Sequence, residues 1–534
     1  MKKHSALLAL LLAMLMLLSA CGAGQGNAPA APAAPDAPEA AAPAAPAAPE
    51  AEAPEEDAEP KTLNIGIILT SDTFDPTLAS NNPALQEVYD SILTRDPVTY
   101  EVIPNLAESW EYNEDGTVMT LHFRDDVYFT NGEKLTPEDA LYSLSRYTVN
   151  DQFYSDCGWD NINFDESYAE GNDLVLKLNS STPLIEAQLA DGNWGTVLCK
   201  SYVEANPDSF WDAPVGSGPY ILTENVADSH YALVRNENYW NGVPDVSNVN
   251  YFIYGDATTM FIDFENGALD IAVDVAAADA ARVINGEVDA QYQMMDTHDI
   301  NYLSLPWYTP EFDDINLRKA ISLALDIEGI TRSAFGDMAE VADSVAVKGL
   351  PFYESQGEHV YDLDQAKQLM AETGYEPGEL TFNLVVFSMP PKQKQAEAIQ
   401  ACLAEIGINV TIEAYDPPTA IPIYMAMGTG IALGGTNGSN YDLAKYMSDS
   451  AADASNQTTA IKDEQYNEWL STGRYSLDPE ERAECYSNIQ KWQAENYRWI
   501  PINYTKSCTV FQNNVHDISG FVYNRLYLEH ITMD

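Results

Sequence analysis

The alternation of apolar and polar residues predicts where the folded part of the chain begins. In the stretch TLNIGIIL, Leu63, Ile65, Ile67 and Leu69 fall on alternate positions, which is the period of a half-buried β-strand. The next stretch, FDPTLASNNP, is rich in turn-forming residues and predicts a loop, and ALQEVYDSIL after it predicts a short helix. We therefore expect a globular body to start near residue 61.

A hairpin is predicted shortly afterwards. The sequence Asn113-Glu114-Asp115-Gly116 ends in the Asp-Gly pair that favours a tight hairpin turn. The following arm, TVMTLHFR, places Met119, Leu121 and Phe123 on one face, and Asn131-Gly132 predicts a second turn.

A capped helix is expected to follow these turns. Thr136 is a favourable N-cap residue, Pro137 suits the first helical position, and Asp139 is placed to complete a capping box. The region from residue 105 to 147 is thus predicted to be hairpin, turn and helix.

Helical periodicity dominates the last third of the chain. An apolar stripe at Leu317, Ala320, Ile321, Ala324 and Leu325 predicts a helix with a buried face. The stretch KQAEAIQACLAEIGINVTIEAYD predicts a helix that ends at a glycine cap, residue 407, followed by a strand. Two further helices are expected in DEQYNEWLST and PEERAECYSNIQKWQAENYRW, and then a strand in IPINYTKSCTVF.

The beginning of the chain is typical of an exported protein. Positive charge precedes an apolar run from Ala6 to Leu18, which is shorter than the ~20 residues that span a bilayer and fits a secretory signal. Small residues flank Cys21, an arrangement that resembles a bacterial lipobox. We expect residues 1–20 to be a lipoprotein signal peptide and Cys21 to carry the lipid. The alternative is an ordinary signal peptide with a chance cysteine.

A low-complexity segment separates Cys21 from the folded body. Residues 28–60 are almost entirely Ala, Pro, Asp and Glu, so they have nothing with which to build a core. Repeated proline blocks helix formation and favours an extended, semi-rigid spacer. Residues 21–60 are therefore predicted to be a lipid anchor followed by a disordered tether.

Charge and composition exclude several classes of function. The chain has 82 acidic and 26 basic residues, whereas a nucleic-acid-binding protein needs a basic face. The seven histidines are scattered, none is paired at metal-ligand spacing, and the common nucleophile, phosphate-loop and zinc-protease motifs are absent. We predict a protein with no enzymatic activity, no cofactor and no bound metal. The five cysteines after Cys21 include no CxxC pair, and a Cys157–Cys199 bridge is left open.

Four blocks of sequence carry a resemblance to a known family. The first consists of Glu108-Ser109-Trp110-Glu111, Gly116, Phe123-Arg124, Val127, Phe129, Gly132, Leu135-Thr136 and Asp139. The others are PVGSGPYIL with VRNENYWNGVPDV, DATTMFIDFENGALDIA, and FDDINLRKAISLALDIEGI. In this order the blocks resemble the family 5 extracellular solute-binding proteins, the peptide- and nickel-binding components of ABC importers, and the matches span nearly everything from residue 63 to the C-terminus.

The resemblance implies an α/β fold with two lobes, similar to type II periplasmic binding proteins of the large cluster with an extra domain, built on mixed sheets with a two-strand hinge. It places lobe one in residues 61–90, 214–302 and 500–534, the extra domain in residues 91–213, and lobe two in residues 303–499. The hinge is expected near residues 302 and 500.

The same resemblance implies where a ligand binds. Peptide binders of the family hold the ligand as an added strand between the lobes. One edge is expected at Ser80, Asn81 and Asn82, after the Asp75-Pro76 turn. The other falls in the stretch GIALGGTNGSNYDLAKYMS, where the family usually has a Trp and an ammonium-binding Asp and this chain has neither at the matching positions. Candidate residues on this side are Thr436, Asn437, Gly438, Ser439 and Asp442.

Asp442 is the nearest acid and is predicted to pair with a peptide ammonium, since a buried ammonium without a counter-charge is costly. The alternative for Asp442 is a solvent-facing position, and the ligand would then be an N-blocked or non-peptide solute. Trp307 and Tyr308, beside the expected hinge, are aromatic candidates for the cleft, as is Trp194, whereas Trp110 and Trp240 are expected to pack in the core.

The implied function is a lipid-anchored receptor that delivers oligopeptides to an ABC permease and its ATPase. Alternatives are a receptor for a nickel chelate, a sugar or an opine-like compound, or a surface hydrolase. We expect a monomer at the outer face of the cytoplasmic membrane, with no nucleic-acid partner.

Overall fold

The computed structural model describes the chain from Pro60 onward, with gaps. The described residues are 60–68, 73–78, 82–97, 99, 101–149, 158–416, 419–420, 423, 430–437, 463–518, 520–521 and 525–534. The predicted signal peptide, Cys21 and nearly all of the predicted tether lie outside them. Within the described ranges, no helix has both the length and the apolar character needed to cross a membrane.

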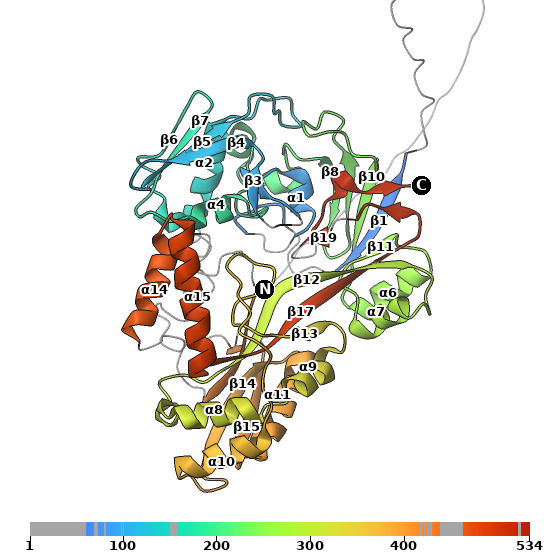
Figure 1. Ribbon diagram of the computed structural model, residues 1–534. Coiled ribbons are helices and arrows are strands. Elements are labelled where there is room, and N and C mark those ends of the chain that lie inside the picture. The colour runs from blue at the N-terminus through green and yellow to red at the C-terminus, as the bar shows by residue number, and fades with distance from the viewer. Residues whose placement is uncertain are drawn as a thin grey trace, which may run out of the picture. The chain divides into compact units, whose positions relative to one another are not determined.

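A long mixed β-sheet runs through the folded body (Figure 1). From one edge to the other its strands are β15 (Asn409–Tyr415), β14 (Thr381–Phe387), β16 (Ile431–Asn437), β12 (Gln291–Ser304), β17 (Trp499–Phe511), β11 (Ile271–Ala272), β1 (Thr62–Ile67), β10 (Asn248–Ile253), β9 (His230–Arg235) and β8 (Tyr220–Val226). A further strand, β13 (Ala339–Val341), pairs with β17. The pairs of β1 with β10 and β11, and of β14 with β15 and β16, are parallel. The strand predicted at residue 62 is confirmed as β1, and its Leu63 and Ile65 are fully buried.

Two long strands join the two groups of shorter strands. β12 and β17 run side by side in Figure 1, with Ser304 opposite Trp499 at one end of the pairing. Their register shifts between Asp296 and Ile300, which marks a β-bulge, and from Asp299 onward β12 also pairs with β16. Because a bulge bends its strand and changes the direction of its side chains, this is the point at which β12 turns from one group of strands to the other.

Helices cover the sheet around β14 and β15. α11 (Pro390–Ala404) packs on both strands and on α9 (Ile327–Phe335), while α8 (Ile315–Ala324) packs on α10 (Leu363–Thr373). The predicted apolar stripe is confirmed, because the side chains of residues 317, 320, 321, 324 and 325 are at most 1% exposed. The predicted helix, glycine cap and strand are also confirmed, since Gly407 has φ +81° between α11 and β15.

A smaller antiparallel sheet contains the predicted hairpin. Its order is β4 (Ala107–Tyr112), β5 (Val118–Phe123), β7 (Asp173–Lys177) and β6 (Tyr168–Glu170). Met119, Leu121 and Phe123 of β5 are at most 3% exposed, as the alternation predicted. α2 (Pro137–Ser145) then packs on β6 and β7. The capping box is confirmed, because Asp139 Oδ2 accepts a hydrogen bond of 3.0 Å from the N–H of Thr136.

The remaining elements are mostly short. They are α1 (Leu85–Val88), β2 (Leu93–Arg95), β3 (Val102–Pro104), η1 (Arg146–Val149), η2 (Trp159–Asn161), α4 (Leu184–Leu189), α5 (Lys200–Ala205), η3 (Phe210–Asp212), α6 (Ala257–Glu265), α7 (Ala277–Ile284), η4 (Pro310–Asp313), α14 (Glu464–Tyr475), α15 (Pro479–Asn496), β18 (Val515–His516), β19 (Gly520–Phe521), β20 (Arg525–Leu526), η6 (Leu528–His530) and β21 (Thr532–Met533). The helix predicted in ALQEVYDSIL is reduced to α1, because the backbone becomes extended at Tyr89.

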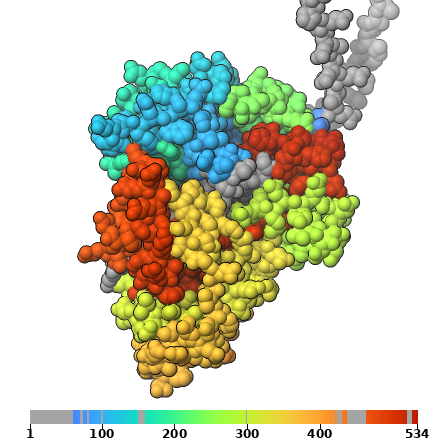
Figure 2. Space-filling model, viewed as in Figure 1, coloured from blue at the N-terminus to red at the C-terminus, as the bar shows by residue number. Residues whose placement is uncertain are grey.

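The two predicted late helices are confirmed as α14 and α15, which pack on each other. Figure 2 shows this pair, in red and orange, reaching the region of the smaller sheet. The contact includes a hydrogen bond of 3.2 Å from Thr182 Oγ1 to the carbonyl oxygen of Arg474.

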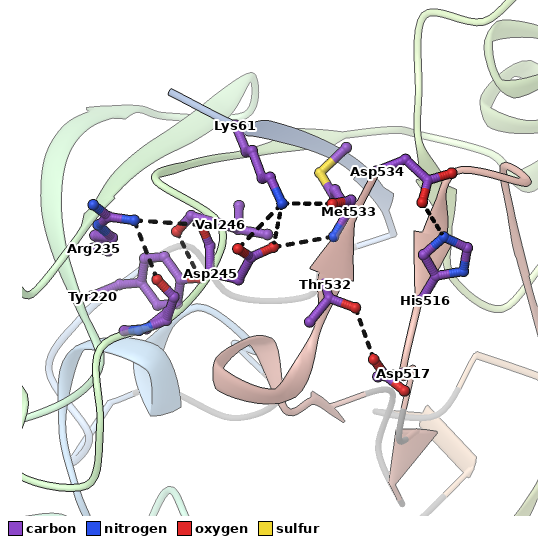
Figure 3. Close-up of polar contacts among 11 residues, drawn as sticks. Lys61, Tyr220, Arg235, Asp245, Val246, His516, Asp517, Thr532, Met533 and Asp534 are labelled. Atoms are coloured by element: carbon purple, nitrogen blue, oxygen red, sulfur yellow. Dashed lines mark hydrogen bonds and ion pairs between the residues drawn. The ribbon is translucent and has the colours of Figure 1, made fainter. Parts of the chain in front are cut away.

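The start and the end of the described body meet at one carboxylate (Figure 3). Lys61 Nζ lies 2.9 Å from Asp245 Oδ2 and 2.6 Å from the carbonyl oxygen of Met533, and the N–H of Met533 donates to the same carboxylate at 3.2 Å. We call Lys61, Asp245 and Met533 the terminal clasp. Beside it, His516 Nε2 lies 2.9 Å from an oxygen of Asp534.

The described cysteines are free thiols. Cys199, Cys485 and Cys508 are buried, and Cys402 packs at the edge of a core cluster. Cys157 lies outside the described residues.

Candidate functional site

A cavity of about 750 Å³ lies where β12, β16 and β17 meet the start of α11. This volume is within the range of small-molecule sites, which run from about 300 to 1,000 Å³. Its lining combines apolar side chains with two acids and two lysines: Asp274, Thr297, Asp299, Ile300, Asn301, Phe335, Phe387, Met389, Pro391, Lys392, Gly435, Thr505 and Lys506.

The β-bulge in β12 sets the direction of the polar groups on one wall. Thr297 Oγ1 lies 2.6 Å from Thr505 Oγ1 across the strand pair, and the N–H of Asp299 donates to Thr297 Oγ1 at 3.3 Å. This places the Asp299 side chain on the cavity wall, one residue before Ile300 returns to the core at 0% exposure.

Asp299 is in an unusual electrostatic state. Its Oδ1 is buried and has no hydrogen-bond partner among the described residues. Burial raises the pKa of Asp299 to about 7, and the positive charge of Lys392 and a hydrogen bond with Thr297 offset only part of that effect. An acid of this kind exchanges its proton near neutral pH and favours a cationic partner.

Lys392 faces the cavity from the first turn of α11. Its Nζ donates a hydrogen bond to Asn301 Oδ1, and Asn301 is only 4% exposed. Burial lowers the pKa of Lys392 to about 8, although the negative charge of Asp299 opposes the shift. Gly435 makes room for this contact, because a Cβ atom there would lie 2.8 Å from Lys392 Nζ.

The second lysine of the lining is already paired. Lys506 Nζ lies 2.9 Å from Glu340 and 4.0 Å from Asp296. Burial raises the pKa of Glu340, but its hydrogen bonds from Lys348 and Lys506 outweigh this and leave the pKa below its usual value. Lys506 is therefore held by acids of the protein.

Another cavity, of about 440 Å³, lies beside Asp90. Its acid already has protein partners: Asp90 accepts hydrogen bonds from Ser217 Oγ at 2.9 Å, Tyr239 OH at 3.2 Å and Trp240 Nε1 at 2.9 Å. Burial raises the pKa of Asp90 to about 6 in spite of these bonds. Because its carboxylate joins parts of the protein to each other, this cavity is the weaker candidate.

The residues predicted from the sequence lie in different places. Ser80, Asn81, Gly438, Ser439 and Asp442 are outside the described residues. Thr436 and Asn437 end β16, where the backbone pairs them with Ile300 and Asp299, next to the cavity.

Asn82 and the aromatic candidates Trp307, Tyr308 and Trp194 do not line the cavity. Asn82 is 1% exposed, and its side chain bonds the backbone of Thr73 and Ala84. Trp307 and Tyr308 pack edge to face with ring centres 6.5 Å apart. Their role in binding stays a prediction. Trp110, Trp194 and Trp240 pack, partly buried, against the core of the smaller sheet.

Sequence reasoning missed Asp299 and Lys392. Asp299 is one of 82 acidic residues, so its type carried no signal. Lys392 carried a weak signal in the sequence, since it is one of only 26 basic residues and directly follows two prolines that begin a helix. Within the described ranges, no three His, Cys, Asp or Glu side chains are grouped so that they could hold a metal ion.

Comparison with known proteins gives a consistent result. The model of the bacterial extracellular solute-binding proteins, family 5, matches residues 101–458. Heme-binding protein A of Haemophilus influenzae is 24% identical over 465 residues, covering 80% of this chain and 84% of its own. The dipeptide-binding protein of Escherichia coli is 22% identical over 510 residues, covering 89% of this chain and 92% of its own. The structure of HbpA2 from Haemophilus parasuis superimposes with a TM-score of 0.80 at 20% identity, covering 89% of this chain and all of that one.

These findings confirm the predicted α/β fold of the type II periplasmic-binding-protein kind. They also confirm the prediction of a binding protein in place of an enzyme, because the relatives are binding proteins. The chain belongs to the bacterial extracellular solute-binding proteins of family 5, the substrate-binding proteins of ABC importers.

Proposed function

We propose that the chain is the lipid-anchored receptor of an ABC importer, which captures oligopeptides in a cleft between two closing lobes and delivers them to the permease. The observation that carries the proposal is the cavity beside β12 and β17, with Asp299 and Lys392 on its wall. It combines apolar surface with a few convergent polar groups, which is the usual composition of a small-molecule site.

Lobe closure is part of the proposal. Lobe one would comprise residues 61–90, 214–302 and 500–534, the extra domain residues 91–213, and lobe two residues 303–499. The pairing of Tyr302 with Pro501 supports a hinge at this level, because both crossing segments lie in one strand pair there. Hinge closure around a ligand is a common rigid-body motion of such receptors.

A peptide is favoured as the ligand by the dipeptide-binding relative and by the acid and base on one wall. The alternative is a non-peptide solute such as a nickel chelate, a sugar or an opine-like compound. The receptor role is the same for a peptide and for a non-peptide ligand. In either case Cys21 would carry the lipid, residues 28–60 would form the tether, and the protein would work as a monomer outside the cytoplasmic membrane.

Mass spectrometry of the full-length protein tests the ligand class. The protein is purified without denaturation, and the small molecules it retains are released and identified. Retained peptides, together with a rise in melting temperature when peptides are added back, are the expected result. Retention of a non-peptide solute and no response to peptides would favour the alternative, and chemical turnover of the ligand would overturn the receptor role.

The anchor needs a separate test. Labelling of growing cells with a fatty-acid analogue should mark the wild-type chain and leave a Cys21→Ser variant unlabelled and released from membranes. A Cys21→Ser protein that kept its lipid label would reject this assignment.

A further inference from the structure

We propose that Asp299 binds a primary ammonium group of the ligand and that Lys392 binds an oxygen atom next to it, so that the cavity takes the free N-terminal end of a peptide. This inference rests on the proposed function and adds the chemistry of recognition to it. It assigns the ammonium to β12 and not to Asp442.

The first observation is the unused capacity of the Asp299 carboxylate. Its Oδ1 is buried on the cavity wall and has no partner among the described residues. Buried polar atoms are nearly always hydrogen-bonded, and a buried unpaired carboxylate costs stability. Asp75, another buried acid, shows how such a group is compensated inside the protein, because it accepts a hydrogen bond from Thr77 and pairs with Arg146. The Oδ1 atom of Asp299 can therefore accept a hydrogen bond from a donor outside the protein.

The second observation concerns Lys392. An ammonium group has three N–H donors. Among the described residues, the Lys392 ammonium donates one hydrogen bond, to Asn301 Oδ1. The charges of Lys392 and Asp299 act on each other, so the two groups are near neighbours on the wall. The N-terminal residue of a peptide carries an ammonium nitrogen bonded to its Cα and a carbonyl oxygen two bonds from the same Cα. Such a head group matches an acceptor and a donor placed together.

The balance of charge around the cavity selects a cation for Asp299. Lys506 is held by Glu340 and Asp296 and adds little positive charge to the space. The lining also carries Asp274, Asp299 and Lys392, and the Asp299 carboxylate is the negative group whose Oδ1 accepts no hydrogen bond from the described residues. A cationic group is therefore attracted, while Lys392 keeps the site from being purely acidic.

A metal ion fits this wall less well than an ammonium. Metal sites need several ligands in a fixed geometry, and no group of three such side chains occurs in the described ranges. A primary ammonium needs only hydrogen-bond acceptors, of which the Asp299 carboxylate supplies two atoms.

The test is a binding measurement on the full-length protein by native mass spectrometry and calorimetry. The probes are a mixture of di-, tri- and tetrapeptides with free N-termini, the same mixture after N-acetylation, free L-leucine, and butylamine. Wild-type protein should bind the free peptides and lose about ten- to hundredfold in affinity for the acetylated ones, as expected for loss of a charge-assisted hydrogen bond in a buried site.

Variants locate the effect on the wall. Asp299→Asn should bind free peptides about ten- to hundredfold more weakly and should no longer distinguish them from acetylated peptides. Lys392→Met should lose about tenfold for both mixtures, because its partner is an oxygen that both contain. Asp296→Asn is the matched control: it removes a carboxylate from the exposed side of the same strand, three residues away, and should stay within about twofold.

Each outcome decides the question. Equal affinity of wild-type protein for free and acetylated peptides overturns the inference while leaving peptide capture intact, as does an unchanged Asp299→Asn variant or a loss confined to Asp442→Asn. If wild-type protein binds neither mixture, the proposed peptide function fails. In that case binding of butylamine or leucine that requires Asp299 upholds the ammonium site, and its absence overturns it. The acetylation comparison uses wild-type protein alone, so it holds even where a variant fails to fold.

Discussion

The Nζ atom of Lys61 lies 2.6 Å from the carbonyl oxygen of Met533, which ties the residue before β1 to β21. Asp245 completes this contact as the counter-charge of Lys61 and the acceptor of the Met533 N–H. Burial raises the pKa of Asp245, but the bonds from Lys61 and Met533 outweigh it, so that its net pKa lies below the usual value.

We expect Lys61→Met to lower the free energy of unfolding by about 1 kcal/mol, since the clasp is a partly exposed, charge-assisted contact. Urea unfolding, monitored by fluorescence, measures this change in the free energy of unfolding. Because the Asp245 pKa is depressed in the folded state, the clasp contributes above the unfolded pKa near 3.8 and is lost as the pH falls through the folded value. The difference between wild type and variant should therefore shrink in acid to the contribution of the hydrogen bond from Lys61 to the Met533 carbonyl oxygen. A difference that stayed the same across this pH range would contradict the ionic origin.

The buried pair of Arg146 and Asp75 is expected to matter more. Arg146 Nη2 lies 3.2 Å from Asp75 Oδ2, and Asp75 is 3% exposed. Arg146→Met leaves this carboxylate buried without a cation and should cost about 3 kcal/mol of unfolding free energy. Arg332→Met is the control, because its pair with Glu328 is highly exposed at both ends, and it should change stability little. Equal losses for the two variants would contradict this reading of burial.

Binding of free-amine ligands should depend on pH in a bell-shaped manner. The pKa of Asp299 is raised to about 7, so its carboxylate becomes neutral, and affinity falls, as the pH drops below that value. The pKa of Lys392 is lowered to about 8, so affinity also falls as the pH rises above it. The charged groups that face Asp299 are Lys392 from α11, Lys506 from β17 and Asp274 after β11. Calorimetry across pH 5.5–9 should place the maximum between the two values.

The acid limb of that profile belongs to Asp299 and can be assigned. A bound ammonium lowers the pKa of its carboxylate partner, so protons are released on binding near pH 7. Calorimetry in buffers of different ionisation enthalpy counts them. Asp299→Asn should abolish both the release and the acid limb, and a profile that kept its acid limb would assign the titration to another group.

Two neighbouring glycines of β16 are expected to respond differently to alanine. At Gly435 a Cβ would lie 2.8 Å from Lys392 Nζ, the mobile end of a long side chain, so Gly435→Ala should weaken ligand binding about tenfold with little loss of stability. At Gly434 it would lie 2.5 Å from the ring of Tyr302, which is stacked on Trp499 at 4.4 Å and cannot move freely. Gly434→Ala should lower stability by about 1–3 kcal/mol. Thermal unfolding and calorimetry of both variants separate the two effects.

The elements that the sequence predicted well are the local ones. The capping box of Thr136 and Asp139 depends on residues three positions apart, and the stripe from Leu317 to Leu325 depends on helical periodicity alone. Both were predictable because their causes lie within a few residues of each other.

The chemistry of the cavity could not be predicted in this way. Asp299 lies on a wall to which residues far apart in sequence contribute, because Lys392 of α11 bonds to Asn301 of β12, 91 residues away. The bulge at residues 296–300 then decides which way the carboxylate points. Neither the long-range packing nor the bulge can be recognised in the sequence pattern. The residue type gives no help either, because acidic residues are common throughout this chain.

The position of β1 in the interior of the sheet has a consequence for synthesis. The hydrogen bond from Asn248 Nδ2 to Thr62 Oγ1 on its parallel partner spans 186 residues of sequence. At about 5–20 residues per second, the ribosome needs roughly 10–40 s to make the partner after it has made β1. During that interval an apolar strand waits with open edges, which are a template for pairing with other chains. β1 is the first of the described strands to be made, and it stays without its sheet neighbours until β10 and β11 have followed about halfway along the chain. Protection of this strand during synthesis is therefore needed only over the first half of the chain.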